Sequence, residues 1–295
     1  MTRSKVFVHK GPDRDEATSS LLRAADLRDL KGKKVLIKPN FNTADPAPGS
    51  THNDGLVSTL YHLNGIGIES VVVGDRSGPS NTKEVFEEKG IFSLAHRIPF
   101  EPIVFDELSH ERYVKVVPNE GHWRNGFLFV KVAGEVDAVI GLCCLKTHAY
   151  GGHFSMGLKL ATGMVHRHNM SELHSSLHMR EMIAEINLAY SPRLVVMDGV
   201  EAFFNGGPMT GGRWQANVSM ASSDRVALDA VGVSLLKMHG TTKEIEKRKV
   251  FEQDQIRRAV ELDLGVHGPE DIEIIPVNDE AESIIEEIVS VLHNR

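Results

Sequence analysis

Histidines are concentrated in one stretch of the chain, CCLKTHAYGGHFSMGLKLATGMVHRHNMSELHSSLH, which spans residues 143–178. Six of the 15 histidines fall there: His148, His153, His166, His168, His174 and His178. Imidazole titrates near neutral pH, which suits proton transfer, and it is the commonest side-chain ligand of transition metals. The stretch therefore predicts a functional site, with an imidazole-rich polar surface as the alternative.

Two of these histidines have helical spacing. Residues 171–189 predict one helix, and its buried side is expected to hold Leu173, Leu177, Ile183 and Ile186. His174 and His178 lie four residues apart and would share one face. With His148 and His153 from the preceding segment, they could hold one divalent transition metal ion. The Glu of a zinc-protease motif is missing, so a metal-free role in proton transfer stays open, especially for His148 and His174.

Three lysines suggest that the ligand is an anion. Lys38 and Lys146 lie at the ends of predicted strands, and Lys159 lies near a Gly-rich turn. Such lysines can hold a phosphate or carboxylate, with added donors from backbone N–H groups at glycines such as Gly206. Neither a G-x-G-x-x-G fingerprint after a strand nor a P-loop is present, so no particular nucleotide is indicated.

Buried strands must position these side chains. Residues 34–38, 68–73, 137–145 and 194–197 each form an apolar run that ends in polar residues. If these strands are parallel, their carboxyl ends meet at one edge of the sheet, where open α/β folds bind ligands. The strand-end residues that we expect to contact substrate are Asn40, Asp75, Ser77 and Gly78. Asp198 follows the last run and is expected to take part in catalysis.

The alternation of strands and helices predicts the fold. Helices expected over 53–64 and 82–96 connect strands and indicate parallel order, since crossovers with helices cover both faces of a sheet. Residues 113–117 and 127–132 alternate around a Gly/Asn-rich link, which is typical of an antiparallel hairpin. The sequence therefore predicts one α/β domain over residues 1–295, a doubly wound, mostly parallel sheet with an inserted antiparallel hairpin. The acidic helix expected at 280–291 would pack on the core or contribute a homodimer contact, and packing is favoured.

Composition narrows the class of protein. The net charge of -7 argues against nucleic-acid binding, since that requires clustered basic residues. Cys143 and Cys144 are the two cysteines, too few for a four-cysteine iron-sulfur cluster. The N-terminal residues have no apolar signal region, and no apolar stretch approaches the roughly 20 residues that span a bilayer. A cytoplasmic protein without membrane partners is expected.

An ordered series of segments resembles a known family. The segments are VLIKPNFN (35–42), VVVGDRSG (71–78), LKTHAYGG (145–152), GLKLATGM (157–164), VVMDGVEAFFNGGP (195–208) and SSDRVALDAVG (222–232). Together they are similar to the family called domain of unknown function 362, over about residues 34–240. The resemblance implies no established reaction. Relatives with ferredoxin-type cysteine motifs imply a redox role, but this chain lacks those motifs.

These observations favour an enzyme that acts on a small phosphate or carboxylate. The catalytic candidates are Lys146, His148, Lys159, His174 and Asp198. Isomerisation or racemisation by proton abstraction, and metal-assisted hydrolysis, are both compatible with these residues. The alternatives are a non-catalytic metal- or ligand-binding protein and a redox accessory protein without its own cluster.

Overall fold

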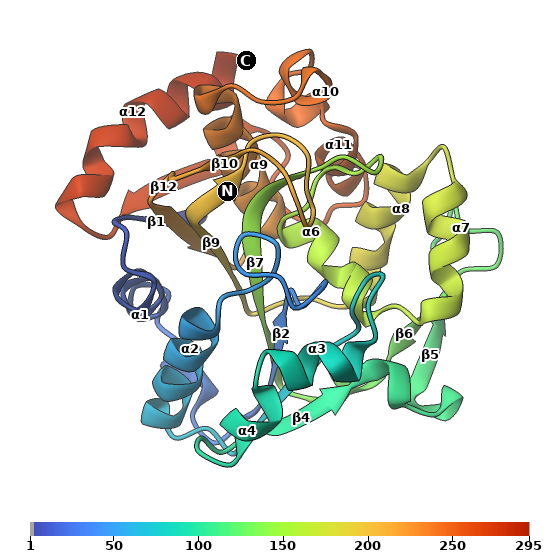
Figure 1. Ribbon diagram of the computed structural model, residues 1–295. Helices are drawn as coiled ribbons and strands as arrows, with labels where there is room; N and C mark the ends of the chain where they lie inside the picture. Colours follow the sequence, from blue (N-terminus) through green and yellow to red (C-terminus); the bar gives the residue numbers. More distant parts are fainter. Residues whose placement is uncertain (1–2, 295) are drawn as a thin grey trace.

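The computed structural model describes residues 3–294 and has a mixed sheet at its centre (Figure 1). Within that range the sheet has ten strands, in the spatial order β12-β1-β11-β9-β7-β2-β3-β4, with β10 added to β9 and β8 added to β7. Along the main path, β11 runs antiparallel to both of its neighbours, and every other pair is parallel. The predicted mostly parallel α/β sheet is thus confirmed.

The strands have the following bounds: β1 Ser4–Lys10, β2 Lys34–Pro39, β3 Ser70–Asp75, β4 Glu101–Val104, β5 Tyr113–Val116, β6 Phe127–Val130, β7 Ala138–His148, β8 His153–Phe154, β9 Leu194–Phe203, β10 Arg213–Trp214, β11 Val218–Ser222 and β12 Ile272–Pro276. All residues of β7 are buried, and β7 lies between β2 and β9. A nearly continuous apolar sequence is what a strand covered on both faces requires.

The helices have the following bounds: α1 Arg14–Ala24, α2 Asn53–Ile66, α3 Thr82–Glu88, α4 Ile91–Ala95, α5 Val132–Glu135, α6 Gly157–Leu160, α7 Met170–Ser175, α8 Met179–Ile186, α9 Arg225–His239, α10 Lys243–Glu246, α11 Asp254–Glu261 and α12 Asp279–Asn294. None of the helices within residues 3–294 has the length and apolar character needed to cross a membrane.

Helices cover both faces of the sheet because its strands alternate their side chains. In β9, Val195 and Met197 join a core with α9 and α12, while Leu194 and Val196 join a core with α1 and α2. Figure 1 shows α1 and α2 on one side of the sheet and α9 and α12 on the other. The last helix packs on the core through apolar residues such as Ile288, as favoured from the sequence.

The predicted hairpin is confirmed as the two-stranded sheet β5-β6, with a core of its own. Tyr113 pairs with Val130 and Val116 with Phe127 in antiparallel register. Phe127 and Phe129 pack there against Met182 and Ile183 of α8. This small layer supports the segment between β8 and β9, which carries four of the six clustered histidines.

Two predicted helices are each divided in the structure. Residues 82–96 form α3 and α4, because Gly90 adopts a left-handed conformation (φ 69°) between them. Residues 171–189 form α7 and α8, with an extended Ser176 between them. Leu177, expected on the buried side, is 90% exposed. His174 and His178 therefore do not share one helix face, and that prediction is wrong.

Candidate functional site

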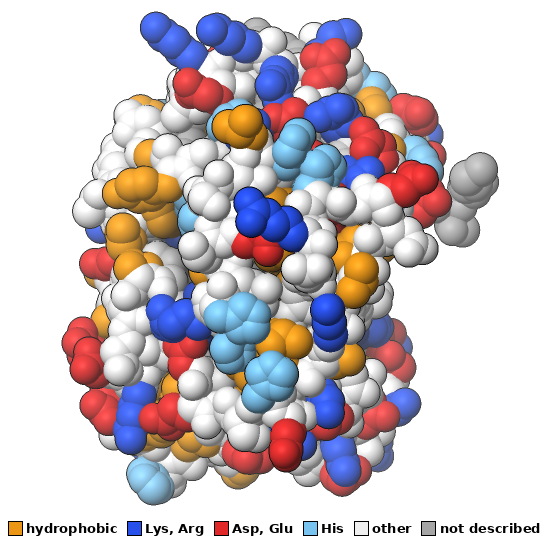
Figure 2. All heavy atoms as spheres, turned by 90° about the vertical axis from the view of Figure 1, so that its right-hand side faces the viewer, with side chains coloured by type: hydrophobic (Ala, Val, Ile, Leu, Met, Phe, Trp, Pro, Cys, Tyr) orange, Lys and Arg blue, Asp and Glu red, His pale blue; other side chains and the backbone are white. Residues whose placement is uncertain are grey.

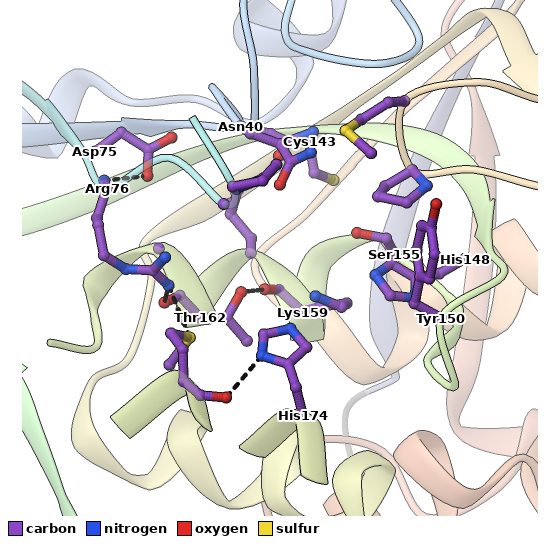
Figure 3. A pocket seen from close by; sticks show the side chains of 18 of the residues that line it. Asn40, Asp75, Arg76, Cys143, His148, Tyr150, Ser155, Lys159, Thr162 and His174 are labelled. Carbon is purple, nitrogen blue, oxygen red and sulfur yellow. Dashed lines mark hydrogen bonds between the residues drawn. The ribbon is translucent and has the colours of Figure 1, made fainter. Parts of the chain in front are cut away.

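A cavity of about 730 Å³ opens at the carboxyl ends of β2, β3 and β7, and we call it the rim pocket. Its lining residues include Lys38, Asn40, Asn42, Asp75, Arg76, Gly78, Cys143, Lys146, His148, Tyr150, Ser155, Met156, Lys159, Thr162, Arg167, Met170, His174, Met179 and Met209. Figure 3 shows many of these side chains facing a common space. The volume falls in the range typical of small-molecule sites.

A buried ion pair occupies one end of the rim pocket. Lys38 Nζ lies 2.6 Å from Asp75 Oδ1, and both side chains are 2% exposed. The Asp75 carboxylate also accepts hydrogen bonds from the backbone N–H groups of Phe41 and Arg76, each at 2.7 Å. Burial lowers the pKa of Lys38, while the opposite charge of Asp75 counteracts that effect. A Cβ at Gly163 would collide with both partners, so glycine is required where this loop crosses the pair.

Backbone carbonyls hold two further cations of the rim pocket. Arg76 Nε donates to Val165 O at 2.9 Å, and its other nitrogens donate to carbonyls that include Thr162 O. Lys146 Nζ donates to Gly49 O at 2.6 Å and to Pro208 O at 3.4 Å. Both side chains are buried, and carbonyl dipoles stabilise their positive charge without neutralising it.

Lys159 differs from these cations. It extends from α6 into the rim pocket and is partly buried, and its ammonium group has no hydrogen-bond or ion-pair partner within residues 3–294. Burial, followed by the positive charges of Lys146 and Arg76, lowers the pKa of Lys159 to about 7. A lysine in this environment exists partly as the neutral amine at physiological pH.

The two histidines of the rim pocket present different ring nitrogens to it. The Gly152 N–H donates to His148 Nδ1 at 3.3 Å, which leaves Nε2 as the protonated nitrogen. Burial and the charges of Lys159 and Lys146 lower the pKa of His148 to about 2, so its imidazole is neutral. His174 Nδ1 lies 2.7 Å from Met170 O and donates to it, which leaves Nε2 free to accept a proton. Burial also lowers the pKa of His174.

The lining of the rim pocket is strongly basic. Its charged residues are five basic ones (Lys38, Arg76, Lys146, Lys159 and Arg167) and one acidic residue, Asp75. Asp75 is already paired with Lys38, and Arg167 forms an ion pair with Asp106 at 2.6 Å. Three basic residues therefore carry positive charge without a carboxylate partner among the described residues, and a bound anion would be stabilised here.

Eight of the residues singled out in the sequence line the rim pocket: Lys38, Asn40, Asp75, Gly78, Lys146, His148, Lys159 and His174. Three other catalytic or substrate-binding candidates lie outside it, as do the metal-ligand candidates His153 and His178. Ser77 is fully buried and its hydroxyl donates to Phe41 O. Gly206 lies in the turn before Pro208 and contacts Thr210 rather than the cavity.

Asp198 is the third catalytic or substrate-binding candidate outside the rim pocket. The sequence places it at a strand end, but β9 continues five residues further, to Phe203. Its carboxylate accepts from Arg14 Nε at 2.9 Å and from the Val200 backbone N–H, beside a small separate cavity. The expectation that Asp198 takes part in catalysis at this site therefore has no support in the structure.

The four histidines proposed as metal ligands do not converge. His148 and His174 line the rim pocket, whereas His153 lies outside it and His178 stacks on His122 with ring centroids 4.4 Å apart. Figure 2 shows groups of histidine side chains on one face of the molecule. The His166 ring contacts the rings of His110 and His168. Within residues 3–294, no group of three or more His, Cys, Asp or Glu side chains is arranged to hold a metal ion. A metal at these histidines stays a prediction.

Sequence reasoning missed several residues of the rim pocket. Arg76 directly follows the predicted strand end at Asp75 and could have been chosen by the same rule. Arg167 and the methionines that line the pocket (Met156, Met170, Met179 and Met209) come from segments without a strand-end signal. Cys143 reaches the rim pocket, although burial raises its pKa, so that the thiol form is favoured.

Comparison with known proteins gives three findings. Residues 35–234 match the family model described as Domain of unknown function (DUF362). The thylakoid-associated protein sll1697 of Synechocystis sp. is 29% identical over 221 residues, which cover 72% of this chain and 65% of that protein's own length. Among solved structures, the lactate racemase apoprotein from Thermoanaerobacterium thermosaccharolyticum aligns with a TM-score of 0.48 and 13% identity, covering 96% of this chain and 86% of that chain.

Proposed function

Because the chain belongs to the family Domain of unknown function (DUF362), whose name assigns no reaction, we propose a function from the rim pocket itself. The protein is an enzyme that binds a small carboxylate or phosphate and moves a proton on it. Lys159 and His174 transfer the proton, and Lys146 and Arg76 attract the anion. We also propose a cytoplasmic location.

The charge of the rim pocket is the observation that supports this proposal. The whole chain has a net charge of -7, yet five of the six charged residues that line the cavity are basic. A concentration of one sign of charge in a cleft, against the sign of the whole molecule, raises the local concentration of the opposite ion. Lysines that are only solvated surface charges would not need to be concentrated in one cavity. Binding of an anion therefore explains the basic lining better than solvation does.

The protonation states of the lining residues suit proton abstraction next to a carbonyl or carboxylate. His174 offers a free Nε2, and Lys159 has a pKa of about 7, so either can accept a proton near neutral pH. His148 remains neutral and offers an Nε2–H donor to an oxygen on which negative charge develops. Isomerisation or racemisation is the reaction class that fits this set.

Hydrogen–deuterium exchange tests this function. Small 2-oxo and 2-hydroxy acids, incubated with the protein in D2O, are expected to exchange the hydrogen on the carbon next to the carbonyl or carboxylate, as followed by NMR. Replacing either transfer group, in Lys159→Met or His174→Asn, should slow the exchange by about 10²-fold or more. Lys131, which is exposed and is not among the residues that line the rim pocket, provides the matched control Lys131→Met.

Binding of the same acids separates the outcomes. An acid that raises the melting temperature of the wild type but never exchanges would indicate a binding protein without catalysis. Exchange that continues at the wild-type rate in both variants would remove Lys159 and His174 from the proposal. If no acid or inorganic phosphate binds at all, the anion site itself is wrong.

A further inference from the structure

Lys159 is the one lysine of the rim pocket, within residues 3–294, whose amine has no partner. Lys38 Nζ is held by Asp75 and by Pro39 O, and Lys146 Nζ by Gly49 O and Pro208 O. The Lys159 amine instead faces the cavity beside His148 and His174 (Figure 3). An unpartnered amine in a cleft is free to act as a nucleophile as well as a base.

We propose that Lys159 forms an imine with the carbonyl carbon of a 2-oxo acid bound in the rim pocket. The substrate class follows from the lining, and it rests on the anion-binding function proposed above. Lysines that become neutral near other cations are the ones that form imines with carbonyl substrates. Lys146 and Arg76 provide that cationic neighbourhood, since the charge of each lowers the pKa of Lys159.

The same two cations suit the carboxylate of a 2-oxo acid. Lys146 uses two of its three N–H groups on carbonyls, so one stays available to an anion. Arg76 also lines the rim pocket, and its guanidinium donates to backbone carbonyls and forms no ion pair within residues 3–294. The carboxylate and the reacting carbonyl are adjacent in a 2-oxo acid, so one small group can satisfy both the cations and the amine.

The rest of the substrate is expected to be apolar. Four methionines line the rim pocket, namely Met156, Met170, Met179 and Met209, together with Leu160 and the ring of Tyr150. Methionine side chains adapt to irregular apolar shapes and make favourable contacts with aromatic rings. A cavity of about 730 Å³ exceeds what pyruvate would fill, so a bulkier side chain such as the phenyl ring of phenylpyruvate fits better.

The step needs no oxidant or metal to balance. The Nζ lone pair forms a C–N bond to the carbonyl carbon as the C=O π pair moves to oxygen. The free Nε2 of His174 takes a proton from the nitrogen and returns it to that oxygen. The C–O bond then breaks as the nitrogen lone pair forms the C=N bond, so that hydroxide leaves and a protonated imine remains. The same Nε2 passes the second nitrogen proton to the hydroxide, which departs as water and leaves the neutral imine. His148 Nε2–H donates a hydrogen bond to the oxygen while it carries charge.

Reductive trapping tests the imine. The full chain is incubated with phenylpyruvate or pyruvate and sodium borohydride, which delivers hydride to C=N and fixes the adduct on the amine. Mass spectrometry of the intact protein and of its peptides locates the adduct. We expect one adduct, on Lys159, in higher yield with phenylpyruvate than with pyruvate. The Lys131→Met control should form it equally well.

Two variants and one inert analogue complete the design. Lys159→Met should form no adduct, and Lys159→Arg, which keeps a positive charge but has no nucleophilic amine, should form none either. His174→Asn should slow the rate of trapping by about 10-fold or more, as expected on losing a proton-transfer group. Adducts spread over several exposed lysines, or an unchanged yield in Lys159→Arg, would overturn the proposal.

Oxamate, an amide analogue of pyruvate that cannot form an imine, separates the two proposals. If oxamate raises the melting temperature of the wild type but neither oxo acid is trapped, the imine is wrong and anion binding stands. If oxamate and both oxo acids fail to bind, the proposed anion site and the proposed imine are both wrong. Both proposals would be supported if Lys159→Met loses oxamate binding as well as adduct formation, while Lys159→Arg loses adduct formation alone.

Discussion

At the scale of single residues, Lys159 makes the stability of the protein depend on pH. Burial beside Lys146 and Arg76 lowers its pKa to about 7, from the usual 10.5. Between these two pH values, the unfolded chain binds a proton that the folded chain has released. The free energy of unfolding therefore rises with pH across this window. Below about pH 7 both states hold the proton, and the folded state bears the full cost of the buried charge.

Replacing Lys159 by methionine should remove this dependence. Lys159→Met is expected to be more stable than the wild type at pH 6, and the difference should shrink as the pH rises to 9, by up to ~1.4 kcal/mol per pH unit. Urea unfolding followed by circular dichroism at several pH values measures it. Comparison with Lys131→Met removes the part of the pH dependence of the unfolding free energy that comes from other titrating groups. A difference that stays constant with pH would show that Lys159 keeps its proton in the folded protein.

At the scale of elements, the short helix α6 needs support from the rest of the fold. It has four residues, Gly157–Leu160, far fewer than a helix needs to be stable alone. The Asp229 carboxylate accepts from the N–H groups of Gly157 at 2.7 Å and Leu158 at 2.9 Å, and Asn187 Nδ2 donates to Leu158 O. Asp229 thus fixes the turn from which Lys159 enters the rim pocket.

Asp229→Ala should therefore affect both stability and reactivity. It leaves two buried N–H groups without an acceptor, and we expect the free energy of unfolding to fall by at least about 1–3 kcal/mol. The yield of the phenylpyruvate adduct on Lys159 should fall as well, because the amine is no longer held in place. Asp229→Asn keeps one acceptor oxygen and should lose less of both. Equal adduct yields in the wild type and Asp229→Ala would show that Asp229 supports only the core.

The element scale also shows why the histidine stretch could be predicted only in part. The apolar spacing of Leu173, Ile183 and Ile186 continues through the break between α7 and α8, so periodicity alone predicts one helix. The break lies at Ser176, whose hydroxyl accepts from the His178 N–H, a local hydrogen bond that competes with helix. The break parts His174, in the rim pocket, from His178, on the surface.

At the scale of the whole molecule, the parallel sheet is the feature that made the site predictable. Strand ends at Lys38, Asp75 and Lys146 converge because β2, β3 and β7 run in the same direction. Asp198 did not follow this rule, because β9 runs on past it in a way that its sequence does not signal. Arg167 could not be predicted either, since its contacts with Gly78 and Asp106 join segments far apart in the chain.

The opposite signs of charge on the rim pocket and on the whole chain lead to a prediction about salt. The net charge of -7 is spread over the surface, where ions screen it beyond about 8 Å at 0.15 M ionic strength and beyond about 30 Å at 0.01 M. Lys146 and Arg76 are buried, so salt would screen their attraction for an anion in the rim pocket much less. Added salt should therefore weaken the long-range repulsion of an anion more than the local attraction.

We expect the affinity for oxamate to change by less than about two-fold between those two ionic strengths. Calorimetry at pH 6, where Lys159 is protonated, measures it, and a bulky sulfonate salt avoids competition from chloride. Lys159→Met should bind more weakly at both ionic strengths. A tenfold loss of affinity with salt would mean that the anion is held by exposed lysines and arginines, because only charges in contact with solvent are screened so strongly. The affinity proposed for the rim pocket comes instead from cations that the fold has buried away from solvent.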